Sequence, residues 1–105
     1  MGTIQERVAR GVVLLDEHHP DWDEKINLDV FDVWSYKNCI VGQLYDGFWK
    51  GLTQLGVANT LTATEAYGFD QRLNRGSYSS LTTAWRRVIE ARRVAPAAEN
   101  RTRRP

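Results

Sequence analysis

The chain has little of the chemistry that marks a secreted protein or a membrane protein. Its 105 residues include one cysteine, one methionine, three prolines and two histidines. A lone cysteine, Cys39, cannot form a disulfide within the chain, which fits a reducing compartment. The longest aliphatic run, Val12–Leu15, is far too short for a membrane span or the core of a signal peptide. We therefore expect a cytoplasmic protein that has no membrane segment.

Recognised catalytic patterns are also missing. The sequence contains no nucleophile elbow, phosphate loop, HExxH motif or dinucleotide fingerprint. His18 and His19 are adjacent, whereas a chelating pair on a helix needs a spacing of three or four residues. Cys39 has no base at close spacing that would activate its thiol. These absences predict no catalytic residue, no metal site and no cofactor, and therefore a protein that is not an enzyme.

Apolar residues recur with helical spacing at both ends of the chain. A first helix is predicted to begin after Thr3, whose spacing to Glu6 is that of a capping box. Its apolar face contains Ile4, Val8, Val12 and Leu15. The apolar face of the last helix contains Tyr78, Leu81, Trp85, Val88 and Ile89. Pro96 is expected to close this last helix, which predicts a single helical domain at 1–95 and a disordered, flexible basic tail at 96–105.

The middle of the chain has two interpretations. The apolar stripe from Ile40 to Leu55 has helical spacing, but three glycines interrupt it and a fourth, Gly56, follows it. Two short helices broken near Gly47 then give an all-α fold, a compact bundle of four to five short helices around an aromatic core that includes Trp22 and Trp85. Asp46-Gly47 is also a hairpin turn signal, so the alternative is an α+β fold with a small hairpin there. The stretch at 26–34 is equally open between a short strand and a loop.

Four segments resemble a family of small uncharacterised proteins from actinobacteria and their phages. These segments are LDEHHPDWDEKINLD (15–29), CIVGQLYDGFWKGLTQLG (39–56), AYGFD (66–70) and YSSLTTAWRRVIE (78–90). The resemblance implies a compact accessory protein and transfers no reaction, cofactor or site residue to this chain. Some relatives have a second cysteine shortly before the CIVGQLY motif, a position where this chain has SYKN (35–38). The resemblance therefore gives Cys39 no cysteine partner.

Charge is sorted along the sequence. Residues 1–70 contain 5 Lys and Arg against 11 Asp and Glu, a net charge of −6, and residues 71–105 contain 9 Arg against 2 Glu, a net charge of +7. A segregated field can steer a partner, bind a polyanion or hold the chain's own ends together. The basic end is rich in arginine, at Arg86, Arg87, Arg92, Arg93, Arg101, Arg103 and Arg104. Phosphate binding and neutralisation by the chain's own acidic half are both compatible with this pattern.

Trp49 is the second candidate for contact with a partner. It follows Phe48 and falls near the edge of the apolar face, so a partly buried core position and an exposed position are both open. An exposed tryptophan beside a lysine is typical of a binding hot spot. The predicted partner-binding residues are Trp49, Lys50, Arg86, Arg87 and Arg93.

These features together favour a non-enzymatic protein-binding module, a phage-encoded accessory or regulatory factor that acts on a cellular or host protein. The alternative is a nucleic-acid-binding protein that uses its arginine-rich last helix and tail. A monomer and a closed homodimer are both compatible with the sequence.

Overall fold

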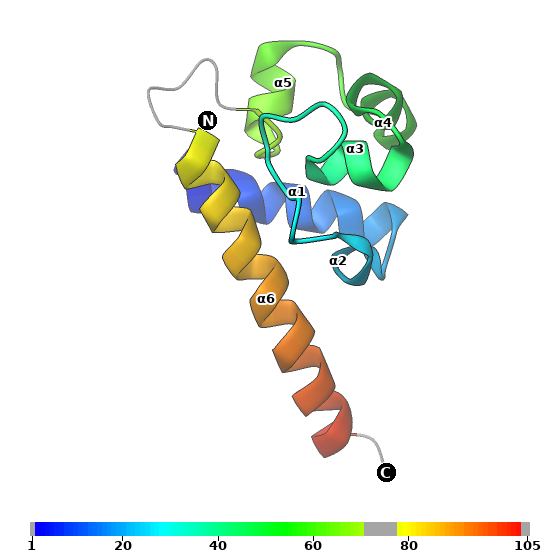
Figure 1. Cartoon of the computed structure of the whole chain (residues 1–105), viewed down its shortest axis with the longest axis vertical. Helices are drawn as coiled ribbons and strands as arrows, with labels where there is room; N and C mark the ends of the chain where they lie inside the picture. Colours follow the sequence, from blue (N-terminus) through cyan, green and yellow to red (C-terminus); the bar gives the residue numbers. More distant parts are fainter. Residues whose placement is uncertain (1, 71–77, 104–105) are drawn as a thin grey trace.

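The structure is a computed structural model that describes the backbone of residues 2–70 and 78–103 and the side chains of these residues up to 94. These two ranges form six helices and no strand, so the all-α prediction is confirmed and the hairpin and strand alternatives are wrong (Figure 1). The helices are α1 (Ile4–His18), α2 (Trp22–Lys25), α3 (Ile40–Tyr45), α4 (Phe48–Leu55), α5 (Leu61–Ala66) and α6 (Tyr78–Arg103). None of them has both the length and the hydropathy needed to cross a membrane.

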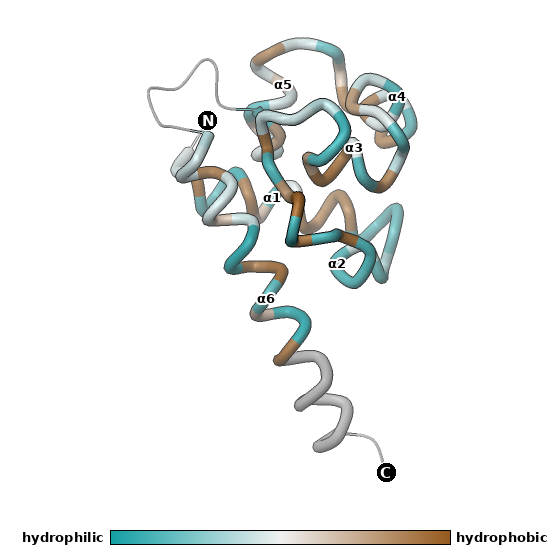
Figure 2. Tube along the Cα trace, viewed as in Figure 1, coloured by the Kyte–Doolittle hydropathy of each residue, from teal (hydrophilic) through white to brown (hydrophobic). Residues whose placement is uncertain are grey.

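The helices are organised around α1. Figure 1 shows α3, α4 and α5 together beside α1, with α6 crossing α1 and extending beyond the other helices at its C-terminal end. Helix α1 contacts α4, α5 and α6, and the short α2 contacts α3 and α6. Apolar and polar residues alternate along α1 and the first half of α6 in Figure 2, as expected for helices that bury one face.

Short-range sequence signals determine where several helices begin. Thr3 and Glu6 form the predicted capping box at the start of α1. The hydroxyl of Thr60 accepts a hydrogen bond from the backbone N–H of Ala63 at 3.1 Å and caps α5. The thiol sulfur of Cys39 accepts a hydrogen bond from the backbone N–H of Gly42 and caps α3. These side chains satisfy N–H groups that have no partner within their own helix.

The break between α3 and α4 lies where the sequence predicted it. Asp46 has φ 59° and Gly47 has φ 144°, so both have backbone conformations that a continuing right-handed helix does not contain. The chain therefore leaves α3 at Tyr45 and begins α4 at Phe48. This break turns α4 back against α3 and directs the N-terminal end of α4 toward the segment that precedes α3.

Two tryptophans organise the core, as predicted. Trp22 and Trp85 have no exposed surface, and their rings meet edge to face with centroids 5.8 Å apart. Phe69 stacks on the Trp85 ring at 6.0 Å. The Trp85 indole N–H donates to the backbone carbonyl of Gly68 at 2.6 Å, which satisfies the only polar atom of this buried side chain. The core thus links α2, α6 and the segment that follows α5.

The C-terminal end of α6 differs from the sequence-based expectation. The helix continues through Pro96 to Arg103, so Pro96 does not close it, and the disordered tail predicted at 96–105 is helical as far as 103. Residues 104–105 lie outside the described part of the chain. Proline removes one N–H donor and crowds the preceding turn. The residues after it, Ala97, Ala98 and Glu99, are strong helix formers, which favours continuation of the helix.

Candidate functional site

Three large aromatic side chains remain on the surface close to one another. Trp34 is 65% exposed, Tyr36 50% and Trp49 44%. All three line one pocket of about 190 Å³, which we call the aromatic pocket. Its aromatic lining residues are Trp34, Tyr36, Phe48, Trp49, Phe69 and Tyr78. The pocket therefore collects rings from α4, from the first turn of α6 and from two connecting segments.

The segment between α2 and α3 presents Trp34 through local hydrogen bonds. The Asp32 carboxylate accepts from the backbone N–H of Trp34 at 3.0 Å, which folds the chain into a short side-chain-stabilised turn. The Asp32 backbone N–H donates to the Asn38 carbonyl at 3.2 Å and closes the loop. The backbone N–H of Val33 donates to the Thr82 hydroxyl at 3.1 Å, which fastens the loop to α6. Trp34 is thus exposed on an ordered turn.

Ring contacts orient the side chains of the pocket. Trp34 meets Tyr78 edge to face with centroids 4.6 Å apart, and Phe48 meets Trp49 in the same manner at 5.0 Å. The phenolic oxygen of Tyr36 lies so close to Gly47 that a Cβ built on that glycine would be 3.1 Å from it. Gly47 therefore provides both the turn before α4 and the space that the Tyr36 ring occupies.

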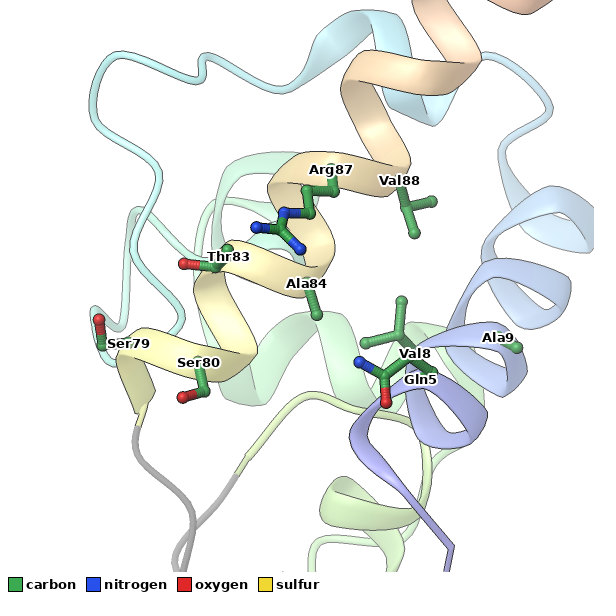
Figure 3. Close-up of a pocket in the computed structure, with 9 residues that line it drawn as sticks. All are labelled: Gln5, Val8, Ala9, Ser79, Ser80, Thr83, Ala84, Arg87 and Val88. Atoms are coloured by element: carbon green, nitrogen blue, oxygen red, sulfur yellow. The ribbon is translucent and has the colours of Figure 1, made fainter.

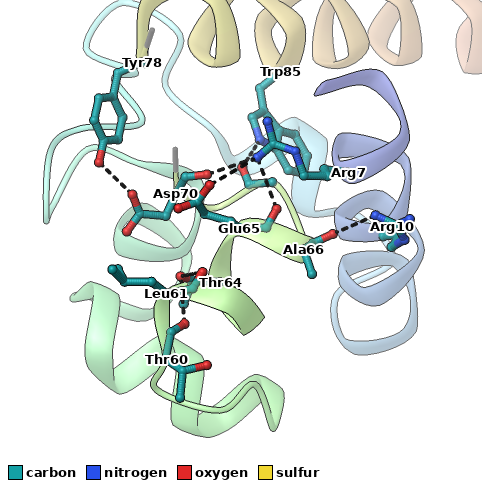
Figure 4. Close-up of polar contacts among 11 residues, drawn as sticks. Arg7, Arg10, Thr60, Leu61, Thr64, Glu65, Ala66, Asp70, Tyr78 and Trp85 are labelled. Carbon is teal, nitrogen blue, oxygen red and sulfur yellow. Dashed lines mark hydrogen bonds and ion pairs between the residues drawn. The ribbon is translucent and has the colours of Figure 1, made fainter. Parts of the chain in front are cut away.

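The inner wall of the pocket is held by hydrogen bonds to Asp70. The phenol of Tyr78 donates to the Asp70 carboxylate at 2.6 Å (Figure 4). Asp70 is only 5% exposed, and its backbone carbonyl accepts from the guanidinium of Arg7 at 3.3 Å. Phe69, which lines the same wall, is stacked on Trp85. The wall is therefore attached to the core from both sides.

Arg7 forms the buried polar centre behind this wall. Its side chain is 1% exposed, and its guanidinium donates to the carbonyl of Glu65 at 3.2 Å. The Glu65 carboxylate is fully buried and lies 4.0 Å from the same guanidinium nitrogen. Figure 4 shows Arg7 pointing from α1 toward the end of α5 and the segment that follows it. A buried charge needs such partners, and here they connect α1 to the residues that support the pocket.

The structure does not bring the five predicted partner-binding residues together. Trp49 lies in the aromatic pocket, and Lys50 is exposed beside it on α4. Arg86 instead donates to the backbone carbonyl of Leu28 at 2.9 Å. Arg93 donates to the carbonyls of Asp23 and Ile26. Arg87 lies elsewhere on α6, where it is exposed in a pocket that residues of α1 also line.

Three arginines of α6, Arg86, Arg92 and Arg93, hold the helix to the first half of the chain. Arg92 lies 2.6 Å from the Asp16 carboxylate and 3.4 Å from that of Asp23. Arg86 and Arg93 add donors to backbone carbonyls that end α2 or follow it. Of the two explanations for the charge sorting, neutralisation within the molecule accounts for Arg92, whereas Arg86 and Arg93 are held by uncharged backbone carbonyls. The guanidinium groups of all three are thereby committed to the fold.

Cys39 is not poised for chemistry. It is 4% exposed, and burial raises the pKa of its thiol to about 11. Its sulfur accepts a hydrogen bond from the Gly42 backbone N–H at 3.2 Å, as a helix cap does. Throughout 2–70 and 78–94, no three His, Cys, Asp or Glu side chains gather in a way that could hold a metal ion. The ring of His19 meets the ring of Tyr45 edge to face, with centroids 5.0 Å apart.

Sequence reasoning found one member of the aromatic pocket and missed others. Trp49 is among the predicted partner-binding residues, whereas Trp34 and Tyr36 are not. The available signal was the tripeptide Trp34-Ser35-Tyr36, in which two large rings stand outside any helical apolar stripe. Aromatic residues that belong to no apolar helix face are candidates for exposure on the surface.

Comparisons of this chain with protein-family models, curated proteins and solved structures give no match. The resemblance to the actinobacterial and phage family therefore stays a prediction, and the function is argued from the geometry of the described residues.

Proposed function

We propose that this chain is a non-enzymatic protein-binding module that holds its partner at the aromatic pocket. The observation that carries the proposal is the convergence of Trp34, Tyr36 and Trp49 on one pocket while all three remain at least 44% exposed. Burying such a ring removes on the order of 150–250 Å² from water, so a partner that covers the three gains substantial apolar contact. Tryptophan and tyrosine are also the residues enriched at binding hot spots.

The pocket supports insertion of one large apolar side chain of the partner. Its volume of about 190 Å³ is small, and its walls are mostly aromatic. The walls are held by the Trp34–Tyr78 contact and by the Tyr78–Asp70 hydrogen bond. Such preorganisation reduces the entropy that is lost when a partner binds.

The resemblance of four segments to a family of small actinobacterial and phage proteins supports an accessory role. We infer a phage-encoded accessory or regulatory factor that acts on a host or cellular protein in the cytoplasm. A single buried thiol, Cys39, suits a reducing environment. The buried thiol with its raised pKa also supports a role without covalent catalysis.

Nucleic-acid binding has less support than protein binding. Phosphate recognition needs free cations, whereas Arg86, Arg92 and Arg93 donate to Leu28, Asp16 and Asp23 of the same chain. Aromatic rings can stack on single-stranded bases, but they do so beside a basic groove. Among the described residues that line this pocket, the charged one is Asp70, which is acidic.

The proposal is tested by affinity capture with immobilised full-length chain. Wild-type protein and a Trp34→Ala/Trp49→Ala variant are incubated with cytosolic lysate of the host, and the captured proteins are identified by mass spectrometry. We expect a defined partner that the wild type retains and the double variant loses by at least about tenfold, because hot-spot truncations cost about 2 kcal/mol or more.

A matched control removes exposed apolar side chains elsewhere. Val13 and Val94 are 59% and 72% exposed and lie outside the aromatic pocket. Val13→Ala/Val94→Ala is expected to capture the partner as the wild type does. Equal capture by the tryptophan variant and the wild type contradicts the proposal. Capture of nucleic acid that weakens steeply with salt, and not with loss of the tryptophans, supports the alternative.

A further inference from the structure

A second hollow lies on another part of the surface, between the first half of α1 and the first half of α6. It has a volume of about 520 Å³, and no described residue lines both this hollow and the aromatic pocket. Pockets of about 300–1,000 Å³ are typical of small-molecule sites. Figure 3 shows side chains from both helices directed into it. We call it the α1–α6 groove.

The floor of this groove is apolar and continuous with the core. Val8 is 2% exposed and belongs to the core cluster, and the half-buried Ala84 and Val88 pack against that cluster. Ala84 contributes only a methyl group at the centre of the groove, which leaves the space open (Figure 3). A hydrocarbon body placed there is removed from water at about 25 cal/mol per Å².

Arg87 supplies the charge of the groove. Its side chain runs back along α6 toward Thr83, so the guanidinium lies at the rim of the groove (Figure 3). Unlike Arg86 and Arg92, it makes no hydrogen bond or ion pair with any described residue. None of the described residues that line the groove is acidic. An unpaired cation at the edge of an apolar floor is complementary to an anion that carries an apolar body.

We propose that the α1–α6 groove binds a small apolar carboxylate. The carboxylate pairs with the guanidinium of Arg87, whose planar group matches two carboxylate oxygens. The hydrocarbon body covers Val8, Ala84 and Val88. The side-chain amide of Gln5, which points into the groove from α1, provides a further donor for the carboxylate. The site is independent of the aromatic pocket and of the partner proposed for it.

Octanoate is a suitable probe, with octan-1-ol and acetate as matched controls. Octan-1-ol has the same hydrocarbon body without the charge, and acetate has the charge without the body. Each is titrated into uniformly ¹⁵N-labelled full chain and followed by two-dimensional amide spectra. We expect saturable octanoate shifts at Val8, Ala84 and Val88, and affinity for each control that is weaker by about tenfold or more.

Two variants identify the group that recognises the charge. Arg87→Gln is expected to weaken octanoate binding by about tenfold or more, because a charge-assisted hydrogen bond is lost. Lys50→Gln removes an exposed cation of α4 outside the groove and is expected to bind octanoate as the wild type does. Arg87 has no described partner in the fold, so its variant is expected to keep the wild-type circular dichroism spectrum.

Several outcomes overturn the inference. They are an absence of saturable octanoate shifts, equal affinity for octanoate and octan-1-ol, unchanged binding by Arg87→Gln, or shifts confined to the Trp34 and Trp49 indoles. None of these results bears on capture of a protein partner by the aromatic pocket. Failure of this inference is therefore distinguishable from failure of the proposed function.

Discussion

Arg92 and Asp16 are 76 positions apart in the sequence, and the Nη2 and Oδ1 atoms of these two side chains lie 2.6 Å apart. The same Asp16 oxygen accepts the indole N–H of Trp22 at 2.9 Å, and the Arg92 guanidinium lies 5.4 Å over the Trp22 ring. One carboxylate thus joins α1, α2 and α6 at the edge of the core. A contact of this kind explains why a chain with sorted charge folds back on itself.

Loss of this contact is expected to weaken the fold measurably. Arg92→Gln removes the ion pair and the cation–π contact, and should lower the free energy of unfolding by about 1–2 kcal/mol. The two side chains are 30% and 40% exposed, so solvent screening keeps the effect below that of a buried pair. Urea unfolding followed by far-UV circular dichroism measures the change.

The Lys25–Asp21 pair provides the control. It lies on the surface at 3.8 Å, with side chains 55% and 58% exposed. Lys25→Gln is expected to change the free energy of unfolding by less than about 0.5 kcal/mol. If the two variants lose equal stability, Arg92 does not join the helices as described.

Because of the Cys39 thiol, we expect the free energy of unfolding to fall as the pH rises above about 9. Burial raises its pKa from 9.0 to about 11, so the folded chain holds this proton more tightly than the unfolded chain does. The contribution is fully present below pH 9 and is lost as the pH rises toward 11. We expect the wild type to lose about 1–3 kcal/mol more than Cys39→Ser over this interval, because serine keeps the helix cap without the titration.

The comparison uses urea unfolding of both proteins at several pH values between 7 and 11. The two curves of stability against pH should run parallel up to about pH 9 and separate above it. Iodoacetamide gives a second readout, since the thiolate is the species that reacts. Rapid alkylation of the native wild type near pH 8 contradicts the assignment.

Gly11 lies where α1 closely approaches its neighbours. A Cβ atom built on it would lie 2.3 Å from the carbonyl oxygen of Tyr67 and 2.7 Å from the ring of Trp85. Alanine gains about 1 kcal/mol in helix propensity, but this overlap forces α1 away from a buried tryptophan. We expect Gly11→Ala to lower the free energy of unfolding by about 1–3 kcal/mol, measured by urea unfolding.

Val13 lies on the same helix and is 59% exposed, which makes it the matched control. Val13→Ala is expected to leave stability within about 0.5 kcal/mol of the wild type. A Gly11→Ala protein as stable as Val13→Ala is incompatible with the packing described.

Local signals in the sequence were sufficient to predict the start of α1 and the break between α3 and α4. Thr3 caps a helix through a bond to a residue three positions away, and Gly47 breaks one through its own backbone angles. Such effects act within a few residues, so a single sequence contains them. The continuation of α6 past Pro96 was missed because a breaking residue had to be weighed against the helix formers that follow it.

The candidate site was harder to predict because it depends on contacts between distant segments. Trp34 is presented through its contact with Tyr78, from another part of the chain. Arg86 resembled a free surface cation in the sequence, yet it reaches the carbonyl of Leu28, 58 positions away. The sequence shows that an arginine has five N–H donors, but it does not show which acceptors they bind. The sorting of charge along the chain can be read from the sequence. The contacts that the arginines make with the first half of the chain are seen only in the structure.

The Tyr78–Asp70 hydrogen bond is expected to maintain the inner wall of the aromatic pocket. Its donor and acceptor oxygens are 2.6 Å apart, and Asp70 is 5% exposed, so the bond is short and shielded from water. Tyr78→Phe keeps the ring against Trp34 and removes the phenol that donates to Asp70. We expect it to lower the free energy of unfolding by about 1–3 kcal/mol and to shift the Trp34 indole resonance, while the fully buried Trp22 indole is unaffected.

Tyr36→Phe is the control, because it removes a phenol from a half-exposed ring of the same pocket. Its effect on unfolding should stay below about 0.5 kcal/mol. Partner capture separates the two roles further: Tyr78→Phe is expected to reduce retention at the aromatic pocket although every ring of the pocket remains. Equal stability of the two variants, together with an unmoved Trp34 resonance, means that the wall is held by packing alone and that the carboxylate of Asp70 does not orient it.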